Sequence, residues 1–74
     1  MIIYADFNNF DPDGFIRLNC SGTESDLSNH SLTLVDGMEL TVSDGDLTAT
    51  IIVRAPSPEG VWRGEIVGAI RGQT

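Results

Sequence analysis

Apolar side chains recur at every second position over several short stretches of the chain. Residues 1–7, 14–20 and 38–43 alternate in this way, and residues 47–55 form the longest such stretch, which is rich in β-branched side chains. Alternation over four to eight residues is typical of β-strands that bury one face. We therefore expect strands over these four segments and a fifth strand that begins near Val61.

Turn signals separate the predicted strands. The dipeptides Asp36-Gly37 and Asp44-Gly45 favour tight turns. Residues 56–60 contain two prolines, which lack backbone donors, and end in a glycine, so they are expected to form a loop.

The polar segment between residues 20 and 31 carries the one helical signal. Thr23 is the expected N-cap, because Asp26 follows three residues later as in a capping box. We expect one or two helical turns around Glu24–Ser28, and Leu27 is expected to fix them to the core because so short a helix is not stable alone.

Together these segments predict an all-β fold in a single domain of residues 1–74. No helical pattern is long enough to cross over between parallel strands, so we expect about five antiparallel strands. A small SH3-like barrel is the first choice, and a strongly curved sheet that pairs across a dimer is the second. The glycines Gly64 and Gly68 would allow the last strand to bend or bulge beside Trp62.

Size and charge narrow the range of functions. A domain of 74 residues has a thin core, which dimerisation would reinforce. The net charge is −7 and the four basic residues are all arginines, so binding to nucleic acids or anionic membranes is not expected. The same charge supports an alternative function as an acidic decoy or inhibitor of a basic nucleic-acid-binding protein or toxin.

The chain also lacks signals for export or membrane insertion. No apolar run reaches the length of a membrane span, and no positively charged leader precedes the first apolar residues. The single cysteine, Cys20, cannot form an internal disulfide, which fits a reducing cytoplasm, and it is expected to be buried near the end of a strand.

Asn9, Asp11 and Asp13 precede Gly14 at alternate positions, as in the first half of an EF-hand calcium loop. Such a loop needs a bidentate carboxylate at its twelfth position, where this chain has Cys20. A tight turn explains the same residues, with Asp11 bonding its own backbone and Gly14 in a left-handed conformation. We therefore predict a turn, with weak binding of a divalent ion as the alternative.

No catalytic constellation stands out in the sequence. His30 has no second histidine and Cys20 no second cysteine, so a zinc site lacks ligands. The glycines of residues 64–72 lack the strand–helix context of a dinucleotide site. We predict that the protein is not an enzyme and has no catalytic residues, metal ligands, cofactor or evident small-molecule substrate.

Three aromatic residues are the candidates for protein binding. Phe10 and Phe15 flank the first predicted turn and would form a patch if both were exposed. Trp62 is the largest ring available to fill the core, but an exposed indole could instead hold an extended peptide.

The stretches YADFNNFDPDGFIRLNCSGTESDL, GMELTV and GVWRGEIV carry a family resemblance. The chain resembles a group of short uncharacterised bacterial proteins that begin with a similar YADFNN stretch and end near a tryptophan. The resemblance implies a bacterial, cytoplasmic protein and no catalytic activity. The function we expect is a non-catalytic protein-interaction module that binds a protein partner and self-associates, as a candidate homodimer.

Overall fold

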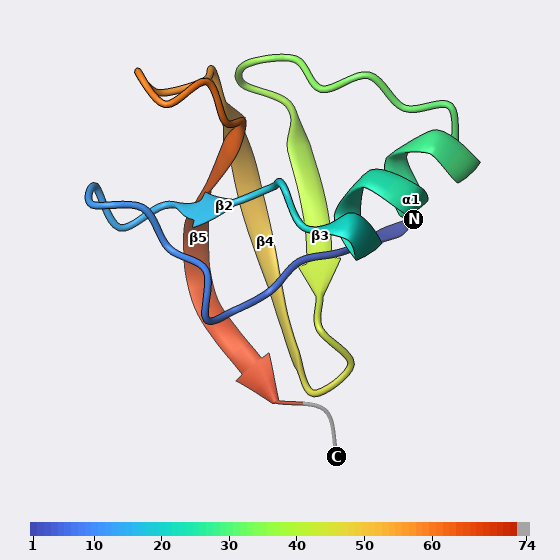
Figure 1. The fold of residues 1–74 in the computed structure, drawn as a ribbon. Coiled ribbons are helices and arrows are strands. Elements are labelled where there is room, and N and C mark those ends of the chain that lie inside the picture. Colours follow the sequence, from blue (N-terminus) through green and yellow to red (C-terminus); the bar gives the residue numbers. More distant parts are fainter. Residues whose placement is uncertain (73–74) are drawn as a thin grey trace.

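The computed structural model describes residues 1–72, which form one curled sheet and one helix (Figure 1). The elements in chain order are β1 (Ile2–Tyr4), β2 (Ile16–Arg17), α1 (Ser21–Asn29), β3 (Glu39–Ser43), β4 (Leu47–Arg54) and β5 (Arg63–Gly72). The five strands are ordered β1-β3-β4-β5-β2 and curl into a half-barrel. The predicted small all-β, SH3-like fold with about five strands and a short helix is therefore confirmed.

Strand direction departs from the expectation at one edge of the sheet. β3, β4 and β5 form the predicted antiparallel meander, and β2 pairs antiparallel with β5. β1, however, lies parallel to β3, with Ile3 opposite Val42. The prediction of a purely antiparallel sheet was wrong here, because the segment between β1 and β3 contains β2 and α1 and is long enough to return the chain to the same end.

The first two strands are shorter than the alternation predicted. Segment 1–7 forms a strand only over Ile2–Tyr4, and segment 14–20 only over Ile16–Arg17. The alternation still identified the buried face, because Ala5 and Phe7 continue the buried row of β1 although the chain there has left the sheet. A pattern of burial persists beyond the residues that hydrogen-bond to a neighbouring strand.

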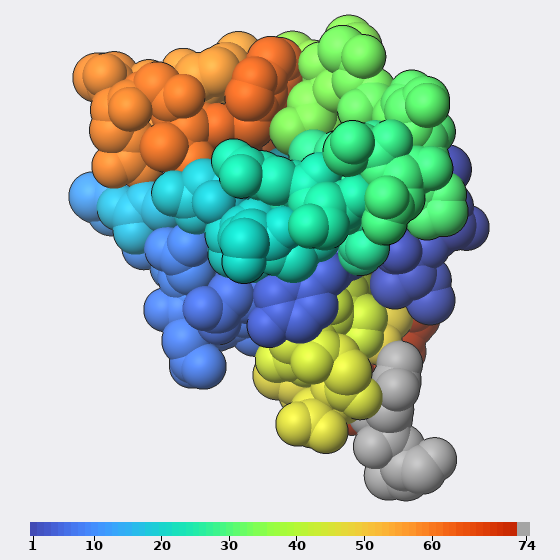
Figure 2. Space-filling model, turned by 45° about the vertical axis from the view of Figure 1, so that its right-hand side comes forward, coloured from blue at the N-terminus to red at the C-terminus, as the bar shows by residue number. Residues whose placement is uncertain are grey.

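The core lies on the concave side of the sheet. Its buried members are Ile3, Ala5, Phe7, Ile16, Leu18, Leu40, Val42, Ala49, Ile51 and Val53. Leu27 of α1 packs against this cluster, as predicted, and so does the half-buried Trp62. Figure 2 shows α1 lying across one face of the molecule, above the N-terminal residues.

The helix begins earlier and runs longer than the sequence suggested. Its N-cap is Cys20 rather than Thr23, and it extends over nine residues. Thr23 lies inside the helix, buried, and its hydroxyl donates to the backbone oxygen of Tyr4 at 2.6 Å. Cys20 is half-buried rather than a core residue, with its Sγ 2.9 Å from the Thr23 hydroxyl.

The last strand bends where glycines were expected to allow it. Val67 lies opposite Thr50, but Arg71 lies opposite Thr48, so β5 contains an irregularity between these pairs. Gly68 lies within it at φ 77°, a left-handed conformation that side chains rarely adopt. The strand continues through Gly72, the last residue that the structure describes.

Candidate functional site

The segment that resembles a calcium loop is a tight turn closed by its own backbone. Asp11 Oδ1 accepts hydrogen bonds from the N–H groups of Asp13 and Phe15, each at 2.9 Å. Gly14 has φ 86° and donates its N–H to the Asp11 carbonyl at 2.9 Å. The predicted turn is confirmed, and the carboxylate at its centre already has partners within the loop.

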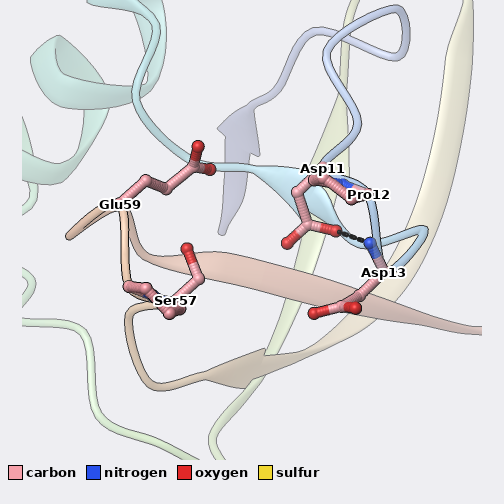
Figure 3. A pocket seen from close by; sticks show the side chains of 6 residues that line it. Asp11, Pro12, Asp13, Ser57 and Glu59 are labelled. Atoms are coloured by element: carbon pink, nitrogen blue, oxygen red, sulfur yellow. Dashed lines mark hydrogen bonds between the residues drawn. The ribbon is translucent and has the colours of Figure 1, made fainter.

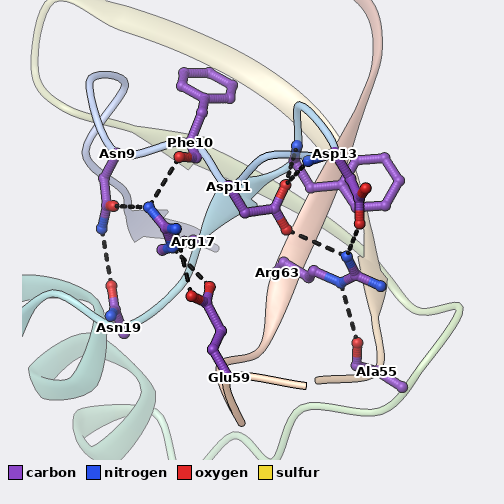
Figure 4. A network of polar contacts seen from close by, with 10 residues as sticks. Asn9, Phe10, Asp11, Asp13, Arg17, Asn19, Ala55, Glu59 and Arg63 are labelled. Carbon is purple, nitrogen blue, oxygen red and sulfur yellow. Dashed lines mark hydrogen bonds and ion pairs between the residues drawn. The ribbon is translucent and has the colours of Figure 1, made fainter. Parts of the chain in front are cut away.

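Arg63 of β5 ties this turn to the sheet (Figure 4). Its Nη1 lies 3.2 Å from Asp11 Oδ2 and 2.8 Å from Asp13 Oδ2. Its Nε donates to the Ala55 carbonyl at 3.2 Å, and its guanidinium lies 5.0 Å from the centre of the Phe15 ring. One arginine therefore joins the turn at Asp11–Gly14, called the first turn below, to the end of β4 and the start of β5.

The charge of Arg63 and the surrounding N–H groups govern the titration of the buried carboxylate. Burial by itself would raise the pKa of Asp11, but the N–H groups of Phe15 and Asp13 together with Arg63 outweigh it and hold the pKa below its usual value. The hydrogen bonds to Asp13 and Asp11 raise the pKa of Arg63 in turn. The group is built to stay ionised rather than to exchange protons near neutral pH.

A second arginine, Arg17, joins β2 to the loop of residues 56–60, called the proline loop below. Arg17 Nε lies 2.7 Å from Glu59 Oε1, and Arg17 Nη1 bonds the Phe10 carbonyl at 2.9 Å and Asn9 Oδ1 at 3.2 Å. Asn9 in turn donates to Asn19 at 2.8 Å (Figure 4). The oxygens of Asn9 and Asp11 that an ion would need thus accept hydrogen bonds from the protein. Within residues 1–72 there is no cluster of three or more histidine, cysteine or acidic side chains suited to a metal ion.

A cavity of about 220 Å³ lies between the first turn and the proline loop (Figure 3). Its lining residues are Asp11, Pro12, Asp13, Ser57, Pro58 and Glu59. The Ser57 Oγ is buried without a hydrogen-bond partner and points toward the space between Glu59 and Asp11. The lining lacks a histidine, cysteine or lysine that could activate this hydroxyl, and its three carboxylates are paired with Arg17 and Arg63.

The aromatic residues singled out from the sequence do not gather into one exposed patch. Phe10 is 36% exposed, but Phe15 is half-buried beneath Arg63, so the condition that both be exposed is not met. Trp62 packs against the core, although part of it remains accessible. Phe10 is the most accessible of the three candidates.

The acidic side chains are spread over the fold, and several serve the backbone directly. Asp6 accepts a hydrogen bond from the N–H of Asn8, and Asp26 accepts one from the N–H of Tyr4. Asp36 accepts from the N–H of Ala55, and Asp44 accepts from the N–H groups of Asp46 and Leu47. Such bonds satisfy donors that the short strands leave free. The acidic decoy stays a prediction, and this scatter gives it no particular face.

The two edges of the sheet differ in a way that the sequence did not reveal. On the outer side of β1, helix α1 covers the backbone of Tyr4, whose N–H donates to Asp26 Oδ2 at 2.8 Å and whose carbonyl accepts from Thr23. At the other edge, β2 pairs with β5 only at Arg63 and Gly64. From Glu65 to Gly72, β5 pairs with β4 on one side and with no described strand on the other.

The uncovered part of β5 also carries exposed apolar side chains. Val67 is 38% exposed and Ile70 is 45% exposed, and all residues from Val67 to Gly72 are exposed. Exposed edges with apolar side chains are sites where a further strand can pair. We take residues 65–72 of β5, called the β5 edge below, as the candidate functional site.

Comparisons with protein-family models, curated proteins and solved structures found no match to this chain. The resemblance to the YADFNN group therefore stays a prediction. Over residues 1–72, the structure contains no helix with the length and apolar character needed to span a membrane.

Proposed function

We propose that this protein is a non-catalytic interaction module that binds an extended protein segment along the β5 edge. The observation that carries the proposal is the open backbone of β5 from Glu65 to Gly72, combined with the exposed side chains of Val67 and Ile70. An extended segment that adds to a sheet edge gains main-chain hydrogen bonds, and exposed side chains beside them give specificity.

The direction of the backbone supports this mode of binding. The Trp62 carbonyl accepts from the N–H of Leu18, so it faces the β2 side of the strand. Backbone groups of alternate residues point to the same side, which directs the N–H and C=O of Gly64 and Ile66 toward this edge. Beyond β2, Ile66 would therefore offer a donor and an acceptor to an incoming strand.

The chemistry of the rest of the surface supports a protein partner over other ligands. A net charge of −7 disfavours phosphate-rich partners such as nucleic acids and anionic membranes. The one cavity described above holds paired carboxylates and no activated nucleophile, which supports a non-catalytic role. A cytoplasmic location, which the lone Cys20 fits, is part of the proposal.

Selection from a displayed library of random linear peptides tests this function. We expect selected peptides to alternate apolar and polar residues, and we expect their binding to be lost in the double variant Val67→Lys/Ile70→Lys, which places charges on the edge. Thr33→Lys/Val35→Lys, at two exposed positions of a loop, adds the same positive charge away from the edge and is the control. Peptides that bind the edge variant as well as the native protein would refute the proposal.

A further inference from the structure

We infer that the segment that pairs with the β5 edge is the β5 edge of a second copy of the same chain, arranged antiparallel about a two-fold axis at Gly68. This inference rests on the proposed function, because it names the partner of the same site. The pairing would join two five-stranded sheets into one continuous sheet across the dimer.

The order of residues along β5 is self-complementary about Gly68. In an antiparallel pair centred there, Glu65 lies opposite Arg71 of the second copy, and Ile66 lies opposite its Ile70. Val67 then lies opposite Ala69 of the second copy. The acidic residue therefore lies opposite a basic one, and each apolar residue lies opposite another apolar residue. Cross-strand pairs of both kinds stabilise β-sheets.

The charged residues at the two ends of this register are available for such pairing. Among residues 1–72, Arg71 is the arginine without an ion-pair partner, whereas Arg17, Arg54 and Arg63 each pair with an acid. Glu65 receives both of its bonds from Arg54 at Oε1, which leaves its Oε2 without a described partner. In the dimer, Arg71 of each copy would lie opposite Glu65 of the other copy, so both Arg71 side chains would gain a carboxylate partner.

The centre of the register suits a two-fold axis. Two copies of the same residue face each other there, and Gly68 contributes no side chain that would hold the strands apart. Its φ of 77° belongs to the irregularity in β5, beyond which Arg71 and Gly72 pair again with Thr48 and Leu47 of β4. The opposite edge of the sheet offers no equivalent site, because Thr23 and Asp26 of α1 occupy the backbone of Tyr4.

Exchange of the two charges provides the test. Glu65→Arg and Arg71→Glu each place like charges opposite one another in a homodimer, so each variant alone is expected to self-associate about tenfold more weakly than the native chain. In a mixture of the two, one chain carries arginine at both positions and the other carries glutamate at both. Each cross-strand charge pair of the mixed dimer again joins an acid to a base, so the mixture is expected to recover the native affinity.

A matched mixture separates this pairing from simple charge attraction. Glu65→Arg changes the net charge from −7 to −5, and Glu39→Arg on β3 does the same, while Arg71→Glu gives −9. A mixture of Glu39→Arg with Arg71→Glu thus has the same net charges but one unfavourable pair at the edge. Circular dichroism of each variant confirms folding before the mass measurements.

Sedimentation equilibrium from about 10 µM to 1 mM reports the result, with masses rising from 8.0 kDa toward twice that value for the native chain. Because Glu39→Arg keeps both native edge pairs and can still self-associate, each mixture is compared with the mass expected from its two variants measured separately. A mass above that value in the charge-exchanged mixture, but not in the matched one, supports the two-fold pairing. A native chain that stays monomeric throughout, or equal behaviour of the two mixtures, would overturn it. Peptides that still bind the edge of a strictly monomeric chain would leave the proposed function standing and remove only this inference.

Discussion

Replacement of Gly64 by alanine tests how closely β5 packs against β4. An added Cβ would meet the side chain of Ile51, at 3.1 Å from its Cβ and 3.2 Å from its Cγ1, and still closer to its Cδ1. Ile51 is fully buried, so its side chain has little room to move aside. Overpacking of this kind costs about 1–3 kcal/mol, and the lower backbone entropy of alanine in the unfolded chain offsets about 0.5–1 kcal/mol.

These terms give a loss between about 0 and 2.5 kcal/mol, so we expect Gly64→Ala to lower the free energy of unfolding by about 1 kcal/mol. That loss moves the urea midpoint down by about 1 M if the slope is about 1 kcal/mol per M. Gly72→Ala in the same strand is the matched control, because its added Cβ would meet no atom within 4 Å. Its effect should stay within about 0.5 kcal/mol.

A double variant identifies the contact responsible. Ile51→Val removes the Cδ1 atom and by itself costs about 0.5–1.5 kcal/mol. Combined with Gly64→Ala, it should cost less than the sum of the two single changes by at least about 0.5 kcal/mol, because the closest contact is gone. Additive effects, or a Gly64→Ala variant as stable as the Gly72→Ala control, would refute the close packing described for these strands.

Three further predictions concern the polar contacts. Hydrogen bonds lower the pKa of Asp11 and Asp44 below 3.8 in the folded state, so the two ionised carboxylates stabilise the fold fully above that pH and lose this effect as the pH falls below it. The urea midpoint should drop over this range. The drop should be smaller in Asp44→Asn, because asparagine keeps a hydrogen-bond acceptor but cannot titrate. Ser57→Ala removes a buried hydroxyl without a partner, so thermal unfolding should show unchanged or higher stability, by up to about 1 kcal/mol, and a clear loss would indicate a bonded hydroxyl. Asp26→Ala frees the Tyr4 N–H at the β1 edge, and it should cost about 1 kcal/mol and increase light scattering on storage, whereas Glu24→Ala in the same helix should do neither.

The sequence predicted best what depends on neighbouring residues. The alternation in residues 38–43 and 47–55 matched β3 and β4 within one residue at each end, because both strands bury one face along their whole length. The Asp11 turn and the irregularity at Gly68 were also predictable, since aspartate and glycine have specific local conformational roles.

What the sequence could not reveal depends on residues far apart in the chain. The parallel pairing of β1 with β3 is set by the path of the chain through α1, not by any feature of Ile2–Tyr4. Thr23 was misread as a cap because its hydroxyl is used by the Tyr4 carbonyl, 19 residues away. The Arg17–Glu59 pair spans 42 residues, and no local spacing signals it.

The candidate site was missed for the same reason. Alternation identifies a strand but does not say which of its edges lacks a neighbour, so the sequence pointed to Phe10, Phe15 and Trp62 rather than to the end of β5. The one available signal was the arrangement of Glu65 and Arg71 around Gly68, which gains meaning only once that edge is known to be open.

Hydrogen exchange at the Ile66 amide tests the central claim most directly, because this N–H points to the open edge of β5. The account predicts that its exchange slows as the protein concentration rises, while the exchange of the Val42 amide in the centre of the sheet does not change. An Ile66 amide that exchanges at the same rate at every concentration would contradict the pairing of two β5 edges.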